Sequence, residues 1–295
     1  MTEFVERVSY LAEGPLALVI GCGDMGMGSA RALGRRHPLL IADRDAERLD
    51  RAVDALVHEG YAARAIACDI TSTGDVNNLA KVIGRGPGVR VLAHVAAVGN
   101  APGGWREVMS VDLLGAHRIA NAVAPHMVRG GVAVLISSTG SRQSQHDPEI
   151  EALLDDPFRP DFEEALIKAF GREPDFLEAY YMAKHGVNRL ARKLAVDLGP
   201  NEVRALSVSP GLIDSTMGRT GGSLLPVYDG GKKRLGSRSE KAVLEVPLGR
   251  QGTIREIVSV IDFVTSDAAS FLSGIDIAVD GGSTAFWQSR GVIGS

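Results

Sequence analysis

Short apolar runs alternate with longer segments of helical periodicity, and this alternation constrains the fold more than any other feature. Most runs are apolar throughout, as is typical of strands buried on both faces of a parallel sheet. The segments between them, such as Asp45–Glu59 and Ala179–Leu198, place apolar residues on one helical face. The alternation predicts an α/β fold with a doubly wound parallel sheet and helices on both faces. The predicted strands are Leu16–Gly21, Pro38–Ala42, Ala62–Ala67, Val89–Val95, Gly131–Ser137, Val203–Val208 and Ile275–Val279.

No linker rich in proline, glycine or serine divides the 295 residues, so we expect a single domain over residues 1–295. Two irregular segments interrupt the alternation. The first, Ser141–Glu178, contains four prolines and a predicted short helix, Asp161–Phe170, capped by Asp161. The second, Ser215–Pro247, is rich in glycine, serine and basic residues, as is typical of a loop.

The composition excludes several classes of protein. The net charge is -4 with both signs mixed along the chain, which gives no basic footprint for nucleic acid or an anionic membrane. Cys22 and Cys68 are too few for a disulfide framework, and no residues have the spacing of a metal site. No apolar run reaches the roughly 18 residues of a membrane span, and the first residues lack a signal-peptide pattern. We expect a cytoplasmic protein without nucleic-acid, membrane or metal partners.

A glycine-rich stretch, VIGCGDMGMG, ends the first predicted strand and opens a helical segment. Gly21, Gly23 and Gly26 form the pattern G-x-G-x-x-G, with Asp24 and Met25 between the last two glycines. The glycines allow a tight turn, close approach of the backbone to a pyrophosphate, and close packing of helix on strand. Free N–H groups at the start of the helix then meet the phosphate. The pattern predicts dinucleotide binding in a Rossmann-type fold, with S-adenosylmethionine binding as the main alternative.

Asp43 ends the second predicted strand, about 20 residues after Gly23. An acidic side chain at this distance is typical of the group that accepts hydrogen bonds from the adenosine ribose of NAD. The same carboxylate repels the 2′-phosphate of NADP, and Arg44 counters part of that repulsion. The sequence therefore favours NAD as the cofactor, with NADP as the alternative.

Tyr180 and Lys184 lie four residues apart in a predicted helix and therefore share one face. A free tyrosine has a pKa of about 10, poorly matched to proton transfer near neutral pH. A neighbouring ammonium group favours the phenolate. The pair can therefore exchange a proton with a hydroxyl or carbonyl group of a substrate. Tyr181 lacks such a partner, because the residue four positions later is His185.

With these motifs the sequence resembles the short-chain dehydrogenase/reductase family over nearly its whole length. ISSTG (Ile136–Gly140) resembles the family's active-site serine segment, and SVSPGLIDSTM (Ser207–Met217) resembles the segment under the nicotinamide. CDI (Cys68–Ile70) resembles the adenine-contacting segment, and Pro247–Gly282 is similar to the C-terminal signature. The motifs occur in the family's order.

The resemblance implies hydride transfer between a nicotinamide cofactor and a carbon that bears oxygen. It implies that Tyr180 is the general acid or base, that Ser138 hydrogen-bonds the same oxygen, and that Lys184 holds the nicotinamide ribose. It also implies a catalytic role for the position of Asp112. To the cofactor-binding residues Gly21, Gly23, Asp24, Met25, Gly26, Asp43, Arg44, Tyr180 and Lys184 it adds Asp69, Ile70, Ala96, Ala97, Pro210, Gly211, Ile213 and Ser215.

Several positions depart from the family's pattern. The glycine loop has Gly21 and Cys22 in place of its Thr and Gly, and the NNAG segment reads HVAA (His94–Ala97). Asp112 stands where the family has an asparagine that helps hold a water in the proton relay to the lysine. A carboxylate there can accept from water and is expected to raise the pKa of Lys184, but it cannot donate while ionised.

Ser138 and Tyr180 lie farther apart in the sequence than in typical members, so we expect an insertion at about 141–178, as in some hydroxysteroid dehydrogenases. Because it begins and ends at catalytic residues, we expect it at the mouth of the active site as a lid or pocket wall, with a subunit contact as the alternative. The apolar face of Asp161–Phe170 would suit a steroid- or terpenoid-like substrate. The loop at about 215–247 lies where the family places its substrate loop.

The sequence thus predicts an NAD(H)-dependent oxidoreductase that acts on a secondary alcohol or ketone. The resemblance implies a homodimer or homotetramer assembled through the helix that bears Tyr180. Two alternatives remain open. One is an epimerase or dehydratase with tightly held NAD, and the other is a nucleotide-sensing regulatory protein on the same fold.

Overall fold

The computed structural model describes residues 14–99, 102–144, 147–216, 227–229, 232–234 and 243–293. Its central sheet has seven strands in the order β11-β6-β5-β4-β1-β2-β3, and each neighbouring pair is parallel. Because the strand order reverses at β1, the sheet is doubly wound, and the predicted Rossmann-type fold is confirmed. The strands are β1 (Leu16–Ile20), β2 (Leu39–Asp43), β3 (Ala63–Ala67), β4 (Val89–His94), β5 (Met127–Ile136), β6 (Arg204–Pro210) and β11 (Asp276–Val279).

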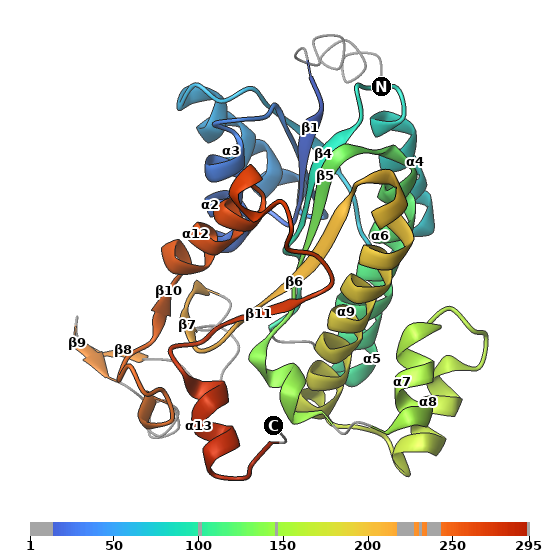
Figure 1. Cartoon of the computed structure of the whole chain (residues 1–295), viewed down its shortest axis with the longest axis vertical. Coiled ribbons are helices and arrows are strands. Elements are labelled where there is room, and N and C mark those ends of the chain that lie inside the picture. The colour runs from blue at the N-terminus through green and yellow to red at the C-terminus, as the bar shows by residue number, and fades with distance from the viewer. Residues whose placement is uncertain are drawn as a thin grey trace.

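Helices cover both faces of this sheet (Figure 1). Alternate side chains of β1 enter different cores, with Ala17 and Val19 on one face and Leu16, Leu18 and Ile20 on the other. The first core is closed by α2 (Asp24–Leu33), α3 (Ala46–His58) and α12 (Ile254–Val264). The second is closed by α4 (Thr73–Ile83), α5 (Gly104–Val108), α6 (Ala116–Val123) and α9 (Phe176–Leu198).

Side-chain caps set the starts of the predicted helices. In α3 the Asp45 side chain accepts from the backbone N–H of Arg48, so the helix begins where the sequence places it. In α9 a capping box joins Asp175 and Glu178, and the helix begins at Phe176, three residues before the predicted start. The longer helix carries Tyr180 inside its second turn rather than at its end.

Within the segment 141–178, α7 (Pro148–Asp155) and α8 (Phe162–Phe170) form a hairpin that packs beside α9 (Figure 1). The predicted apolar face of α8 is present, since Phe162 and Leu166 are 5% and 0% exposed. The predicted cap is wrong, because the Asp161 side chain makes no cap hydrogen bond. Both oxygens of its carboxylate accept from the Arg159 guanidinium instead, at 2.6 and 2.7 Å.

Short elements complete the described chain. Most of the predicted substrate loop 215–247, and Met217 of the nicotinamide motif, lie outside the described residues. Within the described residues, no helix is both long enough and apolar enough to cross a bilayer. The short elements are β7 (Ile213–Asp214), which pairs with β10 (Gly252–Thr253), β8 (Val227–Asp229), which pairs with β9 (Lys232–Arg234), and the helix α13 (Ser283–Ser289).

Candidate active site

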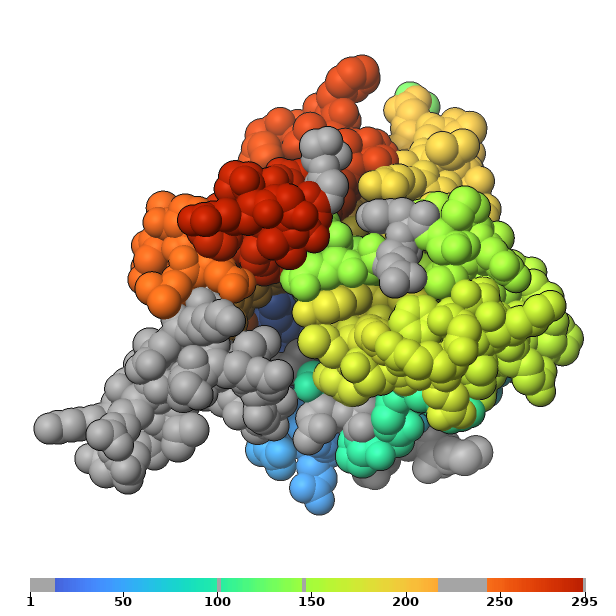
Figure 2. All heavy atoms as spheres, turned by 90° about the horizontal axis from the view of Figure 1, so that it is seen from below, coloured from blue at the N-terminus to red at the C-terminus, as the bar shows by residue number. Residues whose placement is uncertain are grey.

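The candidate site lies at the carboxyl ends of the parallel strands, the lower edge of the sheet in Figure 1. Figure 2 looks onto this edge and shows a hollow, with dark blue atoms of the early chain at depth between the orange and red C-terminal segments and the yellow-green segments. In open α/β sheets, ligands bind at this edge where the strand order reverses. The residues singled out from the sequence follow β1, β2, β3, β4, β5 and β6, so the fold gathers them here.

The glycine loop turns directly after β1 and runs into α2. Gly21 has a φ of 98°, a left-handed conformation that favours glycine. A Cβ on Gly26 would lie 1.8 Å from the carbonyl oxygen of Gly21, so the turn closes only with glycine at this position. A Cβ on Gly23 would meet nothing within 4 Å, and Gly23 caps α2 with no side-chain hydrogen bond. The loop therefore leaves open space at Gly23, next to the first N–H groups of α2.

Asp43 fixes this loop from the end of β2. Its Oδ2 accepts from the backbone N–H of Cys22 at 2.7 Å, and its Oδ1 accepts from that of Asp45 at 3.0 Å. Each oxygen keeps a lone pair, so the half-buried carboxylate can also accept from a ribose hydroxyl. Arg44 is exposed at the surface beside it.

The segments after β3 and β4 form the next part of the rim. The Oδ1 of Asp69 accepts from the backbone N–H and the hydroxyl of Thr71, at 2.8 and 2.7 Å, which shapes the turn after β3. Ile70 is buried, and the half-buried Ala96 and Ala97 follow β4. A Cβ on Gly21 would lie 2.9 Å from the backbone nitrogen of Ala96, so the glycine loop packs closely on this segment.

Ser138 lies between β5 and the 3₁₀ helix η3 (Thr139–Gln143). It is half-buried, and its Oγ accepts from the backbone N–H of Gly140 at 3.1 Å, which leaves the hydroxyl proton available to another acceptor. A Cβ on Gly140 would lie 2.5 Å from the ring of Tyr181, so that ring packs against the turn beside Ser138.

Tyr180 and Lys184 lie one turn apart in α9, as the sequence predicts. The Nζ of Lys184 lies 5.6 Å from the centroid of the Tyr180 ring. Two hydrogen bonds tie this turn to the end of β5. Lys184 Nζ donates to the carbonyl oxygen of Ile136 at 3.4 Å, and the Ser137 hydroxyl donates to the carbonyl oxygen of Lys184 at 2.8 Å.

Asp112 forms a buried ion pair with Lys184. Its Oδ2 lies 3.2 Å from Nζ, and the two side chains are 0% and 2% exposed. Burial alone lowers the pKa of Lys184, but the Asp112 carboxylate and Tyr180 outweigh burial and raise it above its ordinary value. The Oδ1 of Asp112 accepts from the backbone N–H of Val98 at 2.9 Å. Asp112 lies in a π-helical turn, Met109–Gly115, a distortion often found at functional sites.

His94 belongs to this arrangement as well, and the sequence analysis did not predict it as a site residue. It ends β4, is 3% exposed, and its Nε2 has no hydrogen-bond partner among the described residues. Burial, and then the charge of Lys184, lower its pKa to about 3, so the ring is neutral near neutral pH. The departure of HVAA from the family's pattern was the available signal.

Pro210 ends β6, and Gly211, Ile213 and Ser215 lie in the segment that follows it. Of these four residues Pro210 is buried, and the other three are half-buried. The backbone N–H of the next residue, Thr216, donates to Oδ2 of Asp24 at 2.6 Å and joins this segment to the start of α2. Sequence reasoning missed this contact because its partners are 192 positions apart.

The two cysteines are packing residues. Burial, followed by neighbouring carboxylates, raises the pKa of Cys22 and of Cys68 to about 12, so neither is a reactive thiolate near neutral pH. Among the described residues, no group of three or more His, Cys, Asp and Glu side chains is placed to hold a metal ion.

Comparison with known proteins agrees with the fold described above. A family model described as enoyl-(acyl carrier protein) reductase matches residues 24–152 and 168–284. Galactitol 2-dehydrogenase (L-tagatose-forming) of Cereibacter sphaeroides is 26% identical over 294 residues, 95% of this chain and 99% of that protein. Dehydrogenase/reductase SDR family member 4 of Sus scrofa is also 26% identical over 294 residues, 95% and 91% of the two chains. The crystal structure of gox2181 superposes with a TM-score of 0.73 at 25% identity, and covers 96% of this chain and 99% of that chain.

Proposed function

Because this chain belongs to the short-chain dehydrogenase/reductase family of oxidoreductases, we propose that it transfers a hydride between NAD(H) and a secondary alcohol or ketone. The observation that carries this proposal is the buried ammonium of Lys184, which lies 3.2 Å from Asp112 and 5.6 Å from the centroid of the Tyr180 ring. A buried ion pair is weak evidence for stability, whereas a buried cation beside a tyrosine at a ligand-binding edge suits proton transfer.

Each proposed catalytic residue has one task. Tyr180 exchanges a proton with the substrate oxygen, and the ammonium of Lys184 lies 5.6 Å from the centroid of its ring. Ser138 donates its free hydroxyl proton to the same oxygen and orients it. Asp112 acts through Lys184, which it holds in place and keeps protonated.

The residues of the cofactor site fit a dinucleotide. When bound, the nicotinamide ring supplies or accepts the hydride. We propose that Gly21, Gly23, Asp24, Met25 and Gly26 hold the pyrophosphate, as the open space above Gly23 allows. The other proposed contacts are Asp43 and Arg44 with the adenosine ribose, Asp69, Ile70, Ala96 and Ala97 with the adenosine, Tyr180 and Lys184 with the nicotinamide ribose, and Pro210, Gly211, Ile213 and Ser215 with the nicotinamide.

The preference for NAD rests on Asp43. Its carboxylate lies against the glycine loop at the end of β2, where a 2′-phosphate would meet a negative charge. The exposed Arg44 can turn into solvent and does not force the opposite preference. We therefore keep NAD as the proposed cofactor and NADP as the alternative.

The proposal of a hydrophobic substrate rests on Phe176 and not on the apolar face of Asp161–Phe170. Phe162 and Leu166 of α8 are buried in the core, so their face of the hairpin is used for packing. Phe176 is half-buried and stacks on Tyr180 with ring centroids 6.5 Å apart. We propose that Phe176 provides an apolar wall for the alcohol or ketone.

We also propose that residues 1–295 form one domain, with an insertion at about 141–178 and a substrate loop at about 215–247. Residues 153–167, which include parts of α7 and α8, lie outside the family-model match, in accordance with an insertion. A cytoplasmic location and a homodimer or homotetramer also remain proposals.

A matched pair of measurements tests the cofactor site. Calorimetric titration with NADH and NADPH is expected to show tighter binding of NADH. Because a Cβ at position 23 meets no protein atom, Gly23→Ala is expected to keep the wild-type melting temperature while binding NADH at least tenfold more weakly. Unchanged NADH affinity in a folded Gly23→Ala protein would show that the pyrophosphate does not lie there.

The reaction is tested separately. Wild-type protein is expected to reduce NAD with secondary alcohols, and Tyr180→Phe is expected to lose this activity while it still binds NADH. Reduction of an enoyl thioester by NADH without any alcohol oxidation would replace the proposed reaction by carbon–carbon double-bond reduction. Equal turnover by Tyr180→Phe and wild type would remove Tyr180 from the mechanism.

A further inference from the structure

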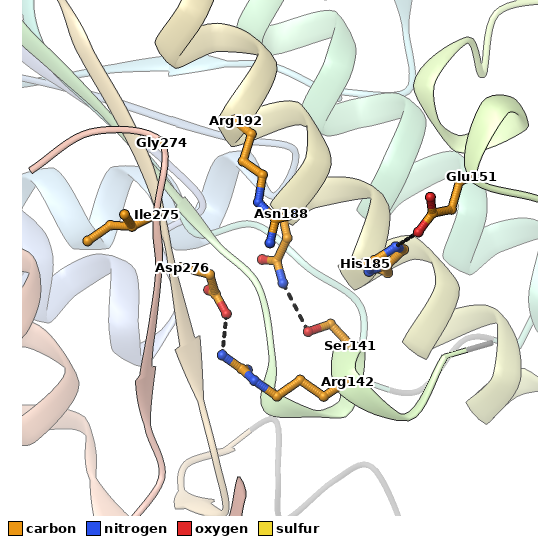
Figure 3. A pocket seen from close by; sticks show the side chains of 9 residues that line it. All are labelled: Ser141, Arg142, Glu151, His185, Asn188, Arg192, Gly274, Ile275 and Asp276. Atoms are coloured by element: carbon orange, nitrogen blue, oxygen red, sulfur yellow. Dashed lines mark hydrogen bonds and ion pairs between the residues drawn. The ribbon is translucent and has the colours of Figure 1, made fainter. Parts of the chain in front are cut away.

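A polar cavity of about 450 Å³ opens between η3, α9 and β11 (Figure 3). This volume lies in the range of small-molecule sites, about 300–1,000 Å³. None of the residues proposed above for catalysis or cofactor binding lines it. It is nonetheless close to them, because η3 begins directly after Ser138, and Asn188 in its wall lies one helical turn after Lys184.

Three of the charged groups in the wall, Arg142, Asp276 and Glu151, already form ion pairs. Arg142 pairs with Asp276 at 2.6 Å, and the other oxygen of Asp276 accepts from two serine hydroxyls of β6. Glu151 pairs with His185 at 2.9 Å and with Arg189 at 2.7 Å. These contacts satisfy both carboxylates, so neither is left to attract a cation.

Arg192 is the cation that remains. It lines the cavity, is exposed, and makes no ion pair with any residue in the described part of the chain. In Figure 3 its side chain extends from α9 toward the cavity on the same side of the helix as Asn188. The guanidinium of Arg192 is therefore a charged group of the wall without a counter-charge among the described residues, and it can pair with a negative group of an occupant.

The same wall contains polar atoms with no partner. Asn188 is 5% exposed, and its Nδ2 donates to the Ser141 hydroxyl at 3.0 Å, but its Oδ1 meets no donor among the described residues. The Nη1 of Arg142 likewise meets no acceptor there. Buried polar atoms are almost always hydrogen-bonded, so a buried acceptor and a buried donor at one cavity indicate a polar occupant.

We propose that this cavity is a binding site for a small hydroxycarboxylate. The carboxylate pairs with the guanidinium of Arg192, whose planar fork matches two carboxylate oxygens. A hydroxyl group donates to Oδ1 of Asn188 and accepts from Nη1 of Arg142. A simple carboxylate would leave Asn188 without a donor, and a neutral alcohol would leave Arg192 without a counter-charge. The class thus follows from one unpaired cation together with one acceptor and one donor.

The test is calorimetric titration of the full chain with L-lactate and D-glycerate at fixed ionic strength and with saturating NADH. Arg192→Ala is expected to weaken binding at least tenfold, because it removes the guanidinium that pairs with the carboxylate. Lys193→Ala is the matched control, since Lys193 is exposed on the same helix, pairs with Asp197 and is absent from the cavity wall. It is expected to bind within twofold of wild type.

Further variants separate this site from the active site. Tyr180→Phe is expected to bind both anions as wild type does. Asn188→Asp, which keeps the side-chain shape and adds a negative charge, is expected to weaken binding at least tenfold. In wild type, acetate and propane-1,2-diol are each expected to bind at least tenfold more weakly than L-lactate.

Three results would overturn the proposal. The first is the absence of saturable heat with either hydroxycarboxylate, and the second is equal affinity in wild type and Arg192→Ala. The third is a change in sedimentation coefficient for Arg192→Ala without any anion binding, which would make the cavity a contact between copies of the chain.

Discussion

Because Asp112 forms an ion pair with Lys184, the asparagine that the family has at this position is expected to destabilise this chain. Asp112 uses both oxygens, Oδ1 for the backbone N–H of Val98 at 2.9 Å and Oδ2 for Nζ of Lys184 at 3.2 Å. Both neighbours are donors. An asparagine has a single acceptor oxygen, so in Asp112→Asn the amide nitrogen must face one of these donors. We therefore expect the substitution that restores the family pattern to reduce stability.

The expected loss follows from the geometry. At 3.2 Å and an effective dielectric constant of about 20, the attraction between the charges is about 5 kcal/mol before desolvation is subtracted. Removing one member of a buried pair costs about 3–5 kcal/mol, because the other charge is left buried without a partner. We expect Asp112→Asn to lower the free energy of unfolding by about 3 kcal/mol at pH 7.

The pH dependence of this loss has a definite sign. The pKa of Lys184 is raised in the folded chain, so its contribution is fully present below the unfolded pKa of about 10.4. The contribution disappears as the pH rises through the higher pKa of the folded state. The difference in unfolding free energy between wild type and Asp112→Asn should therefore become smaller in alkaline solution. Activity in alcohol oxidation should fall as well, because Lys184 loses the partner that holds it beside the ring of Tyr180.

Urea denaturation followed by circular dichroism measures the change in stability at each pH, and kcat/KM for alcohol oxidation measures the change in activity. Asp54→Asn, an exposed position on α3, is the matched control and should leave both unchanged. The reasoning is refuted if the unfolding free energy of Asp112→Asn lies within about 0.5 kcal/mol of wild type and its kcat/KM equals that of wild type.

Three further predictions concern the buried histidines, the glycine loop and Asp43. Burial, the largest cause in each case, lowers the pKa of His94 to about 3 and of His117 to about 4, so the unfolded chain binds protons first and stability falls as the pH drops below about 6.5. Between pH 7 and pH 5 each histidine should remove about 2 kcal/mol of unfolding free energy, and His117→Asn should flatten this dependence in urea titrations. Gly26→Ala, unlike Gly23→Ala, should lower the melting temperature as well as abolish NADH binding, because its Cβ meets the backbone at 1.8 Å. Asp43→Ser should reduce NADH affinity about tenfold and raise the ratio of NADPH to NADH affinity in calorimetry, and an unchanged ratio would count against Asp43 as the selective residue.

The sheet was predictable because its signal is local. All seven predicted strands are present with ends shifted by a few residues, since strands buried on both faces are apolar along their whole length. The largest shift is in β5, which begins at Met127 and not at Gly131. Its first residues lack the run of apolar residues that marks the rest of the strand. Gly130 has a φ of 74° there, and the register against β4 is irregular.

The candidate site was predictable in its residue types and not in its contacts. Tyr180 and Lys184 share a helix, so their spacing in the sequence fixes their relation. The partners of Lys184 come from elsewhere, Asp112 from the π-helical turn and the carbonyl oxygen of Ile136 from β5. Likewise, the link from Asp24 to Thr216 depends on how distant loops meet. Contacts of this kind depend on tertiary packing, which one sequence does not encode in its local periodicity.

The apolar stripe of α9 illustrates how the same pattern can serve two purposes. Val187, Leu190 and Leu194 fit a subunit contact equally well on periodicity alone, but all three are buried in the core of their own chain. The adjacent face of α9 is occupied by α7. A Cβ on Gly186 would lie 2.4 Å from a side-chain atom of Leu113 and 3.4 Å from Leu154 of α7, and Arg189 pairs with two carboxylates of that helix. The stripe is therefore accounted for by packing within the chain, and an assembly of copies has to use side chains other than these.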